Sequence, residues 1–222
     1  MLSDTLLKHQ LTLCLITSIR GHHYDYASTI TQAIKGGATM VQLREKGPNI
    51  SKIKEKALFI QNLVKPYGVP LIINDHVALA AEINADGVHI GQGDISVCEA
   101  RKILGKQKII GVSIESFDDL HRANNNSEIS YVTASAVFPS ISKPDCKTIW
   151  GIDNLHKLTA ISTHPMTAIG GINMTNAHTV FEAGVCGIAV IGAIHNAKDP
   201  CEAAKELTRS ANYHSHSQTL GL

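Results

Sequence analysis

Apolar residues recur in two alternating patterns along the chain. Short, nearly unbroken apolar runs, such as Ile188 to Ile191, are typical of parallel strands that are buried on both faces. Longer segments place apolar residues three or four positions apart, as in 51–64, and these predict amphipathic helices. The expected strands are 11–17, 40–44, 70–73, 87–90, 109–113, 131–137, 166–169 and 187–191. The expected helices are 25–35, 51–64, 77–83, 96–104, 116–124, 154–161, 175–183 and 200–211.

These segments form eight consecutive strand–helix units with short connections between them. Strict alternation predicts parallel strands with crossover helices, and eight units that close on themselves form a (β/α)8 barrel, or TIM barrel. The α/β class is therefore expected, with an open doubly wound sheet as the structural alternative. We expect a single barrel domain over 1–212 and a polar tail over 213–222.

Composition narrows the class of protein. The 222 residues carry 20 Lys and Arg against 19 Asp and Glu, which gives a net charge of +1, and 44% are apolar. This balance predicts a globular protein rather than a general binder of nucleic acid or membrane surfaces, which is usually basic. The N-terminal segment lacks the apolar stretch of a signal peptide, and five scattered cysteines form no C-x-x-C pair. A cytoplasmic protein with reduced thiols is therefore expected.

Polar and basic side chains follow the second expected strand. Gln42, Arg44 and Lys46 alternate with Leu43 and Glu45, so they share one side of the chain. Active sites of (β/α)8 barrels lie at the carboxyl ends of the strands, and arginine and lysine both suit phosphate. The alternative is a solvated strand end, where surface ion pairs contribute little.

Two aspartates follow the next two strands. Asn74 and Asp75 come after the third strand, and Asp94 follows the fourth, with Gln92 just before it. Two carboxylates at neighbouring strand ends are able to share Mg²⁺, which keeps other positions for water and substrate phosphate. The alternative is that each aspartate caps the next helix. Their joint occurrence beside a basic strand end favours a metal–phosphate site, whereas His89 is interpreted as a packed core residue.

Hydroxyl and glycine residues mark further anion contacts. Ser113, after the fifth strand, either donates to a phosphate or caps the next helix. The loop over 139–151 contributes Ser140, Ser142 and Lys143. A loop of this length is often a functional lid, and the alternative is an ordinary surface turn. Gly171 and Gly192, after the last two strands, predict a phosphate site built from backbone N–H groups. Two phosphorylated substrates, one of them with Mg²⁺, would explain both sites.

A set of motifs resembles the thiamine phosphate synthase family. The motifs are Val41 to Lys46, Ile73 to Asp75, Ala85 to Gln92, Gly111 to Ser113, Val137 to Pro139 with Lys143 and Asp145, and Ala168 to Ile172. They occur in the order of the family from about Leu11 to Leu207, and they are specific as a set. The family joins a hydroxymethylpyrimidine pyrophosphate to a thiazole phosphate by a dissociative reaction, which yields thiamine phosphate and pyrophosphate.

The resemblance implies a role for each candidate residue and a homodimeric assembly. The pyrimidine pyrophosphate would be held by Gln42, Arg44, Lys46 and Asn74, and Mg²⁺ would be ligated by Asp75 and Asp94. Contacts to the pyrophosphate would come from Ser113 and Lys143, with Lys143 assisting its departure. Contacts to the thiazole phosphate would come from Ser140, Ser142, Gly171, Ile191 and Gly192.

The chain departs from the family pattern on the thiazole side. Thr133 to Ala136 stands where the family usually has Gly-x-Gly-Pro, and these bulkier residues predict a narrower barrel mouth. Serines replace the usual threonines at 140 and 142, and Gly192 replaces a serine. Two alternative functions remain open, an isomerase similar to thiazole tautomerases and a non-catalytic barrel that binds thiamine precursors. Retention of both aspartates, Arg44 and Lys46 favours the transferase.

Overall fold

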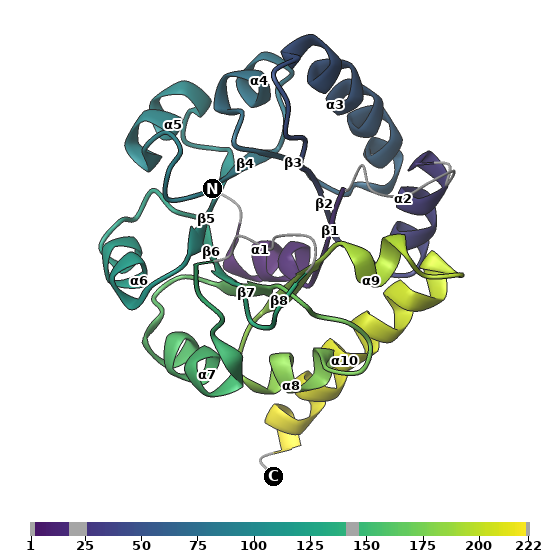
Figure 1. Cartoon of the computed structure of the whole chain (residues 1–222), viewed down its shortest axis with the longest axis vertical. Helices are drawn as coiled ribbons and strands as arrows, with labels where there is room; N and C mark the ends of the chain where they lie inside the picture. The colour runs from purple at the N-terminus through teal and green to yellow at the C-terminus, as the bar shows by residue number, and fades with distance from the viewer. Residues whose placement is uncertain (1–2, 18–25, 141–146, 221–222) are drawn as a thin grey trace.

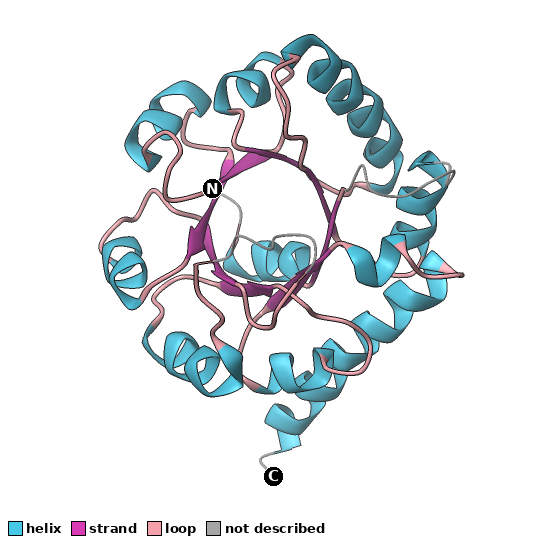
Figure 2. Cartoon of the chain, in the orientation of Figure 1, coloured by secondary structure: helices cyan, strands magenta, loops and turns pink. Residues whose placement is uncertain are grey.

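The computed structural model describes residues 3–17, 26–140 and 147–220 as a closed parallel barrel. The strands follow one another around the barrel in chain order, and the last pairs with the first (Figures 1 and 2). They are β1 (Leu13–Ile16), β2 (Met40–Leu43), β3 (Leu71–Asn74), β4 (Gly87–Ile90), β5 (Ile109–Ile114), β6 (Tyr131–Ser135), β7 (Met166–Ile169) and β8 (Gly187–Val190). The predicted (β/α)8 barrel is confirmed, and the open sheet is excluded because the sheet has closed.

Helices surround the barrel as an outer ring (Figure 2). They are α2 (Tyr26–Lys35), α3 (Ile50–Val64), α4 (Val77–Glu82), α5 (Val97–Leu104), α6 (Phe117–Asn124), α7 (Gly151–Ile161), α8 (Ala177–Glu182) and α10 (Pro200–Leu220). Short additions to this ring are the 3-10 helix η1 (Lys65–Tyr67) and α9 (Gly192–His195). No helix in the described parts of the chain combines the length and apolar character that a membrane span needs.

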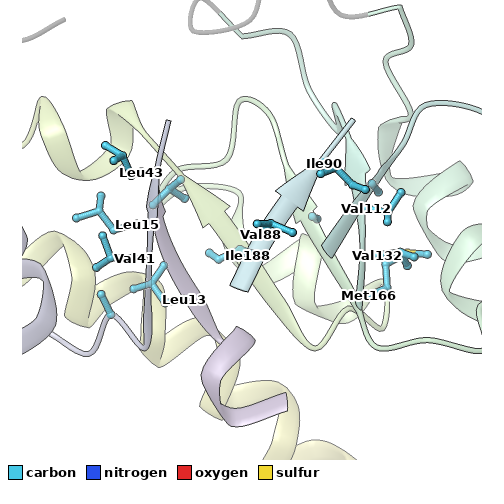
Figure 3. Packing of buried hydrophobic residues seen from close by; sticks show 14 of the residues in the cluster. Leu13, Leu15, Val41, Leu43, Val88, Ile90, Val112, Val132, Met166 and Ile188 are labelled. Carbon is cyan, nitrogen blue, oxygen red and sulfur yellow. The ribbon is translucent and has the colours of Figure 1, made fainter. Parts of the chain in front are cut away.

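Residues on each strand alternate between the outer helices and the barrel interior. Leu13, Leu15, Val41 and Leu43 belong to the apolar layer between strands and helices, which Figure 3 shows from close by. The residues between them on β1, Cys14 and Ile16, belong to a separate apolar cluster within the barrel. The period of two therefore divides each strand into a packing face and an interior face.

An additional helix, α1 (Asp4–Leu11), precedes the first strand and was not predicted. It begins at Ser3, whose side chain accepts a hydrogen bond from the Leu6 backbone N–H, and its buried face consists of Leu7 and Leu11. Both leucines pack in the interior cluster, and Figure 1 shows α1 lying across the bore. The chain from residue 11 was predicted as strand, but Leu11 ends this helix, which closes the amino-terminal end of the barrel.

The C-terminal segment differs from the predicted tail. Helix α10 was expected to end at residue 211, yet it continues to Leu220 and takes up most of 213–222. Polar residues do not oppose helix formation by themselves, and neither proline nor glycine interrupts the sequence between Pro200 and Gly221. The polar composition of this segment indicated that it lies outside the core pattern, but it did not indicate whether the backbone is helical.

Candidate active site

A cavity of about 410 Å³ opens at the carboxyl ends of the strands, where active sites of such barrels lie. It reaches down the bore as far as Leu11 of α1. The predicted residues that line it are Gln42, Arg44, Lys46, Asn74, Asp75, Asp94 and Ser113. The structure therefore brings these seven candidate residues into one site, although they come from four different strand ends.

The end of β2 supplies the basic side of this cavity. Gln42 is buried, Arg44 is half-buried and Lys46 is exposed, and all three line the cavity as their spacing predicts. Glu45 points the other way, and its carboxylate accepts a hydrogen bond of 2.7 Å from Lys56 Nζ of α3. Glu45 therefore pairs with Lys56 on the outer side of the barrel and does not line the cavity with Arg44 and Lys46.

Asp75 and Asp94 form the acidic side of the cavity. Their side chains are hydrogen-bonded to each other, and Asp94 also accepts a hydrogen bond of 2.7 Å from the Gly91 backbone N–H. Burial, together with the neighbouring Asp94, raises the pKa of Asp75 from 3.8 to about 6, while His76 and Arg44 act to lower it. Two ionised carboxyls this close repel each other, and a divalent cation between them would remove that repulsion.

This donor set fits Mg²⁺ better than it fits zinc. Mg²⁺ is commonly held by one or two carboxylates, whereas zinc takes three or four protein ligands. Within 3–17, 26–140 and 147–220, no group of three or more His, Cys, Asp or Glu side chains is placed to hold a metal. The pair of Asp75 and Asp94, beside the amide of Asn74, therefore matches the smaller oxygen-ligand set of Mg²⁺.

The capping alternative for the two aspartates is wrong. Helix α4 begins after His76, and α5 begins after Ser96, which forms a capping box with Glu99. Asp75 instead lies in the left-handed region with φ of 65°, a conformation that is uncommon outside glycine. Neither aspartate is needed to start a helix, which strengthens their assignment to the cavity.

Ser113 lies on β5 with its hydroxyl in the cavity. Its Oγ is 3.0 Å from His89 Nε2, and its backbone carbonyl accepts a hydrogen bond of 2.6 Å from Gln92 Nε2. The alternative role as a helix cap is wrong, because Ser116 caps α6. Ser113 is thus held from two sides at a position where it lines the cavity.

A second cavity of about 290 Å³ adjoins the first. Four of the residues predicted to contact a second phosphate line it, namely Ser140, Gly171, Ile191 and Gly192. Gly171 has φ of 63°, and a Cβ added to it would lie 2.6 Å from the Pro139 carbonyl oxygen. A side chain at this position would both strain the backbone and displace the loop after β6.

The two cavities share part of their walls. Ser135, Ile169 and Ala189, which come from β6, β7 and the end of β8, line both of them. Ligands in the two cavities would therefore lie next to each other, with these three residues beside both. Two substrates that react with each other fit such an arrangement.

The departure from the family pattern on β6 is accommodated by its neighbours. Thr133 turns its hydroxyl into the barrel, where it is hydrogen-bonded to Thr167 at 2.8 Å. Ala136 packs against Gly170, where an added Cβ would approach the Ala136 Cβ to 2.3 Å. Both cavities are open despite the larger residues, so the predicted narrowing does not close the barrel mouth.

The comparison with protein families agrees with this geometry. The sequence model described as thiamine monophosphate synthase matches residues 13–194. The chain belongs to the thiamine monophosphate synthase family. It is 39% identical over 183 residues to thiamine-phosphate synthase of Chlamydia caviae, covering 82% of this chain and 86% of that protein. It is 40% identical over 195 residues to thiamine-phosphate synthase of Vibrio campbellii, covering 88% and 95%.

A solved member of the family has the same barrel. Thiamine phosphate pyrophosphorylase from Pyrococcus furiosus superposes with a TM-score of 0.85 at 32% identity, covering 94% of this chain and 98% of that one. The 3-hexulose-6-phosphate synthase of Salmonella typhimurium superposes with a TM-score of 0.68 at 15% identity, which reflects the fold alone. The thiamine monophosphate synthase family therefore accounts for nearly the whole described barrel.

Two candidate residues of the family's reaction cannot be placed by the structure. Ser142 and Lys143 lie outside the described residues. Their roles, contact with the thiazole phosphate and assistance to the departing pyrophosphate, stay predictions. Lys147, which follows this segment, lines the first cavity, and its Nζ lies 3.7 Å from Glu115 Oε2.

Several residues that line the cavity were missed from the sequence. Among them, His89 and Tyr131 line the first cavity, and His89 was interpreted only as a core residue. His89 is indeed buried, but it faces the bore while its neighbours Val88 and Ile90 pack outward. Strand alternation contains this signal, because an interior polar residue in a barrel lies beneath the active site.

Proposed function

We propose that this protein transfers the hydroxymethylpyrimidine group from its pyrophosphate to the nitrogen of a thiazole phosphate, giving thiamine phosphate and pyrophosphate. The thiazole phosphate is 4-methyl-5-(2-phosphoethyl)thiazole or its carboxylated form. The observation that carries the proposal is the pair of adjoining cavities with a common wall at Ser135, Ile169 and Ala189. The carbon–nitrogen bond would form at this wall.

The first cavity suits the pyrimidine pyrophosphate. Gln42 and Asn74 supply amides near the ring, and Arg44 and Lys46 supply positive charge for the phosphates. Mg²⁺, held by Asp75 and Asp94, would neutralise charge on the departing pyrophosphate. The protein's own basic groups and amides would orient the same phosphates before the bond breaks.

Bond cleavage in this proposal is dissociative. The bond between the pyrimidine methylene and the pyrophosphate oxygen breaks first, and both electrons leave with pyrophosphate. Ser113 donates a hydrogen bond to that leaving group, and Lys143 assists its departure. The electron-rich aminopyrimidine ring carries the resulting positive charge until the thiazole nitrogen supplies the electron pair of the new bond. Stabilising the leaving group is therefore the main task of the protein.

No covalent nucleophile is required, and the thiol in the cavity is unsuited to that role. Cys14 lines the floor of the cavity, where burial raises the pKa of its thiol to about 12. A thiol with this pKa stays protonated at neutral pH and is a poor nucleophile. Cys14 is thus a poor candidate for a covalent nucleophile in this reaction.

The second cavity suits the thiazole phosphate. Ser140 and Ser142 would contact the phosphate with their hydroxyls, together with backbone groups at Gly171, Ile191 and Gly192. The glycines permit close approach of a phosphate to the backbone. The larger β6 residues, Thr133 to Ala136, would face the thiazole from the shared side.

The test is a two-substrate assay with purified protein. Both phosphorylated precursors are mixed with Mg²⁺, and thiamine phosphate and pyrophosphate are quantified together. Equal amounts of both products are expected, and omission of either precursor should abolish both. Isomerisation of the thiazole alone would indicate the tautomerase-like alternative. Binding of both precursors without any product would indicate the non-catalytic alternative.

Two further parts of the proposal concern location and assembly. The resemblance to the family supports a homodimer, and the scattered cysteines without a C-x-x-C pair support a cytoplasmic location. Light scattering coupled to size-exclusion chromatography would give the mass in solution, and a monomer at micromolar concentration would contradict the homodimer.

A further inference from the structure

A row of hydrogen-bonded side chains crosses the floor of the first cavity. Ser113 Oγ lies 3.0 Å from His89 Nε2, and His89 Nδ1 lies 3.1 Å from the Tyr131 hydroxyl. The Tyr131 hydroxyl is in turn hydrogen-bonded to the side chain of Gln42. The row links β5, β4, β6 and β2, and both ends of it line the proposed pyrimidine pyrophosphate site.

The sequence makes room for this row. A Cβ added to Gly111 would lie 2.1 Å from Tyr131 Cζ. Only glycine at this position therefore leaves space for the phenol ring of Tyr131 to lie over β5. Gly111 and Tyr131 are direct partners in the pairing of β5 with β6. His89 and Tyr131 are both buried. A buried polar row is costly unless its members are hydrogen-bonded, which is the case here.

The direction of the hydrogen bonds decides what Ser113 is able to do. A neutral imidazole carries one hydrogen, so one of its nitrogens donates and the other accepts. If His89 Nδ1 accepts from Tyr131, then His89 Nε2 donates to Ser113 Oγ and the serine hydrogen points elsewhere. In the opposite direction, Ser113 donates to His89 and has no hydrogen for a second acceptor.

The surroundings of Tyr131 favour the first direction. Burial raises the pKa of Tyr131 well above its usual range, so the phenol keeps its hydrogen at neutral pH. The side chain of Gln42 is hydrogen-bonded to the phenol, and its amide N–H is a donor that the phenol oxygen is able to accept. When Gln42 donates to this oxygen, the phenol hydrogen is directed to His89 Nδ1.

We infer that Tyr131 and His89 are positioning residues which hold His89 as the Nε2–H tautomer, so that the Ser113 hydroxyl donates its hydrogen to the departing pyrophosphate. A carboxylate or phosphate oxygen accepts hydrogen bonds only, so an anionic leaving group needs this orientation of the serine. The role of the row rests on the proposed function, since it specifies how Ser113 serves that reaction.

The tautomer is tested directly by nuclear magnetic resonance. The intact protein is labelled with ¹⁵N-histidine in mildly alkaline buffer, with and without Mg²⁺ and pyrophosphate. Among the 12 histidines, the His89 signals are those absent from the H89Q spectrum. A pyrrole-type Nε2 and a pyridine-type Nδ1 are expected in both conditions. A pyrrole-type Nδ1 with pyrophosphate bound would overturn the inference.

Kinetics provide an independent test. S113A is expected to lower kcat about ten- to a hundredfold, and Y131F about two- to tenfold, with smaller changes in KM. If Tyr131 acts through Ser113, Y131F should have no further effect in the S113A background. Multiplicative effects of the two substitutions would overturn the inference, because a merely structural role of Tyr131 would persist without the serine.

Two further variants serve as conservative replacement and control. Gln at position 89 keeps an N–H donor toward Ser113, so H89Q should retain more kcat than H89L. Equal kcat of these two variants would overturn the inference. Tyr67 of η1 is exposed and lies outside both cavities, and Y67F should match the unsubstituted protein. If the unsubstituted protein makes no product, the proposed function fails, whereas the wrong tautomer in an active enzyme removes only this inference.

Discussion

Replacing Asp75 by asparagine is expected to stabilise the protein without Mg²⁺ while it lowers activity. Asparagine has nearly the same shape as aspartate and tolerates the φ of 65° at this position. The substitution therefore removes a charge and leaves the backbone conformation in place. The variant therefore distinguishes the effect of the buried carboxylate on stability from its contribution to activity.

The size of the effect follows from the pKa of Asp75. Burial and the neighbouring Asp94 raise it from 3.8 to about 6. Each unit corresponds to about 1.4 kcal/mol, and solvent screening of this partly exposed group reduces the total to about 1–2 kcal/mol. The folded protein binds the proton more tightly than the unfolded chain does, so ionisation costs stability. This cost is absent below pH 3.8, grows as the pH rises, and is complete above about pH 6.

Urea unfolding with a chelator, followed by circular dichroism at acidic and alkaline pH, measures this difference. At alkaline pH, D75N should unfold at a higher urea concentration than the unsubstituted protein, and at strongly acidic pH the two should nearly coincide. The matched control is D4N on α1, at the opposite end of the barrel. It removes the exposed ion pair with Lys8 and a negative charge in the first turn of α1, which together stabilise the protein by about 1 kcal/mol or less, so D4N should not raise stability.

The same two variants are then compared in the synthesis assay. D75N should lower the rate strongly and lose stabilisation by Mg²⁺, while D4N should keep both. A D75N protein that is less stable at alkaline pH would refute the reasoning, because Asp75 would then be an ordinary structural carboxylate. Unchanged synthesis by D75N would refute the metal assignment instead.

Three further results are expected from the same structure. The Mg²⁺ concentration for half-maximal rate should rise as the pH falls below about 6, because protons compete for Asp75, and a Mg²⁺ titration at several pH values would show whether it stays constant instead. G171A should raise KM for the thiazole phosphate about tenfold, because the φ of 63° and the Pro139 carbonyl oxygen, 2.6 Å from the added Cβ, both oppose a side chain. An equal rise in KM for the pyrimidine substrate would contradict this. G111A should destabilise the barrel by about 1–3 kcal/mol in urea unfolding, because its Cβ would overlap the Tyr131 ring, and unchanged stability would mean that the ring is able to move.

Most of the barrel was predictable because its strands pack outward against helices. Each strand has alternate residues in the apolar outer layer, as Val41 and Leu43 do on β2. Helix α1 was missed because the burial of its apolar residues depends on tertiary packing. Its apolar residues are few, and the significance of Leu7 and Leu11 becomes visible only when the bore they fill is known. No local pattern indicates that a short helix closes the far end of a barrel.

The rim of the site was more predictable than its floor. Arg44, Asp75 and Asp94 follow directly after strands, where residue type and position together suggest chemistry. The floor depends on which side chains meet across the bore. Gln42 and Tyr131 lie on β2 and β6, which are not neighbours in the sheet, and their hydrogen bond follows from barrel closure. Residue spacing along one strand contains no information about such a pair.

The division between outer and inner faces also explains why this barrel tolerates costly groups. The outer layer of Leu, Ile and Val supplies stability through apolar burial around the whole ring, largely independent of the bore. The interior of the barrel and its rim are therefore able to hold a buried tyrosine–histidine pair and, at Asp75, a carboxyl with a raised pKa. A substitution on the outer face should change stability with little effect on substrate preference. At the site, substitutions should change stability and activity independently. D75N, which is expected to raise stability and lower activity, is the most direct measure of this independence.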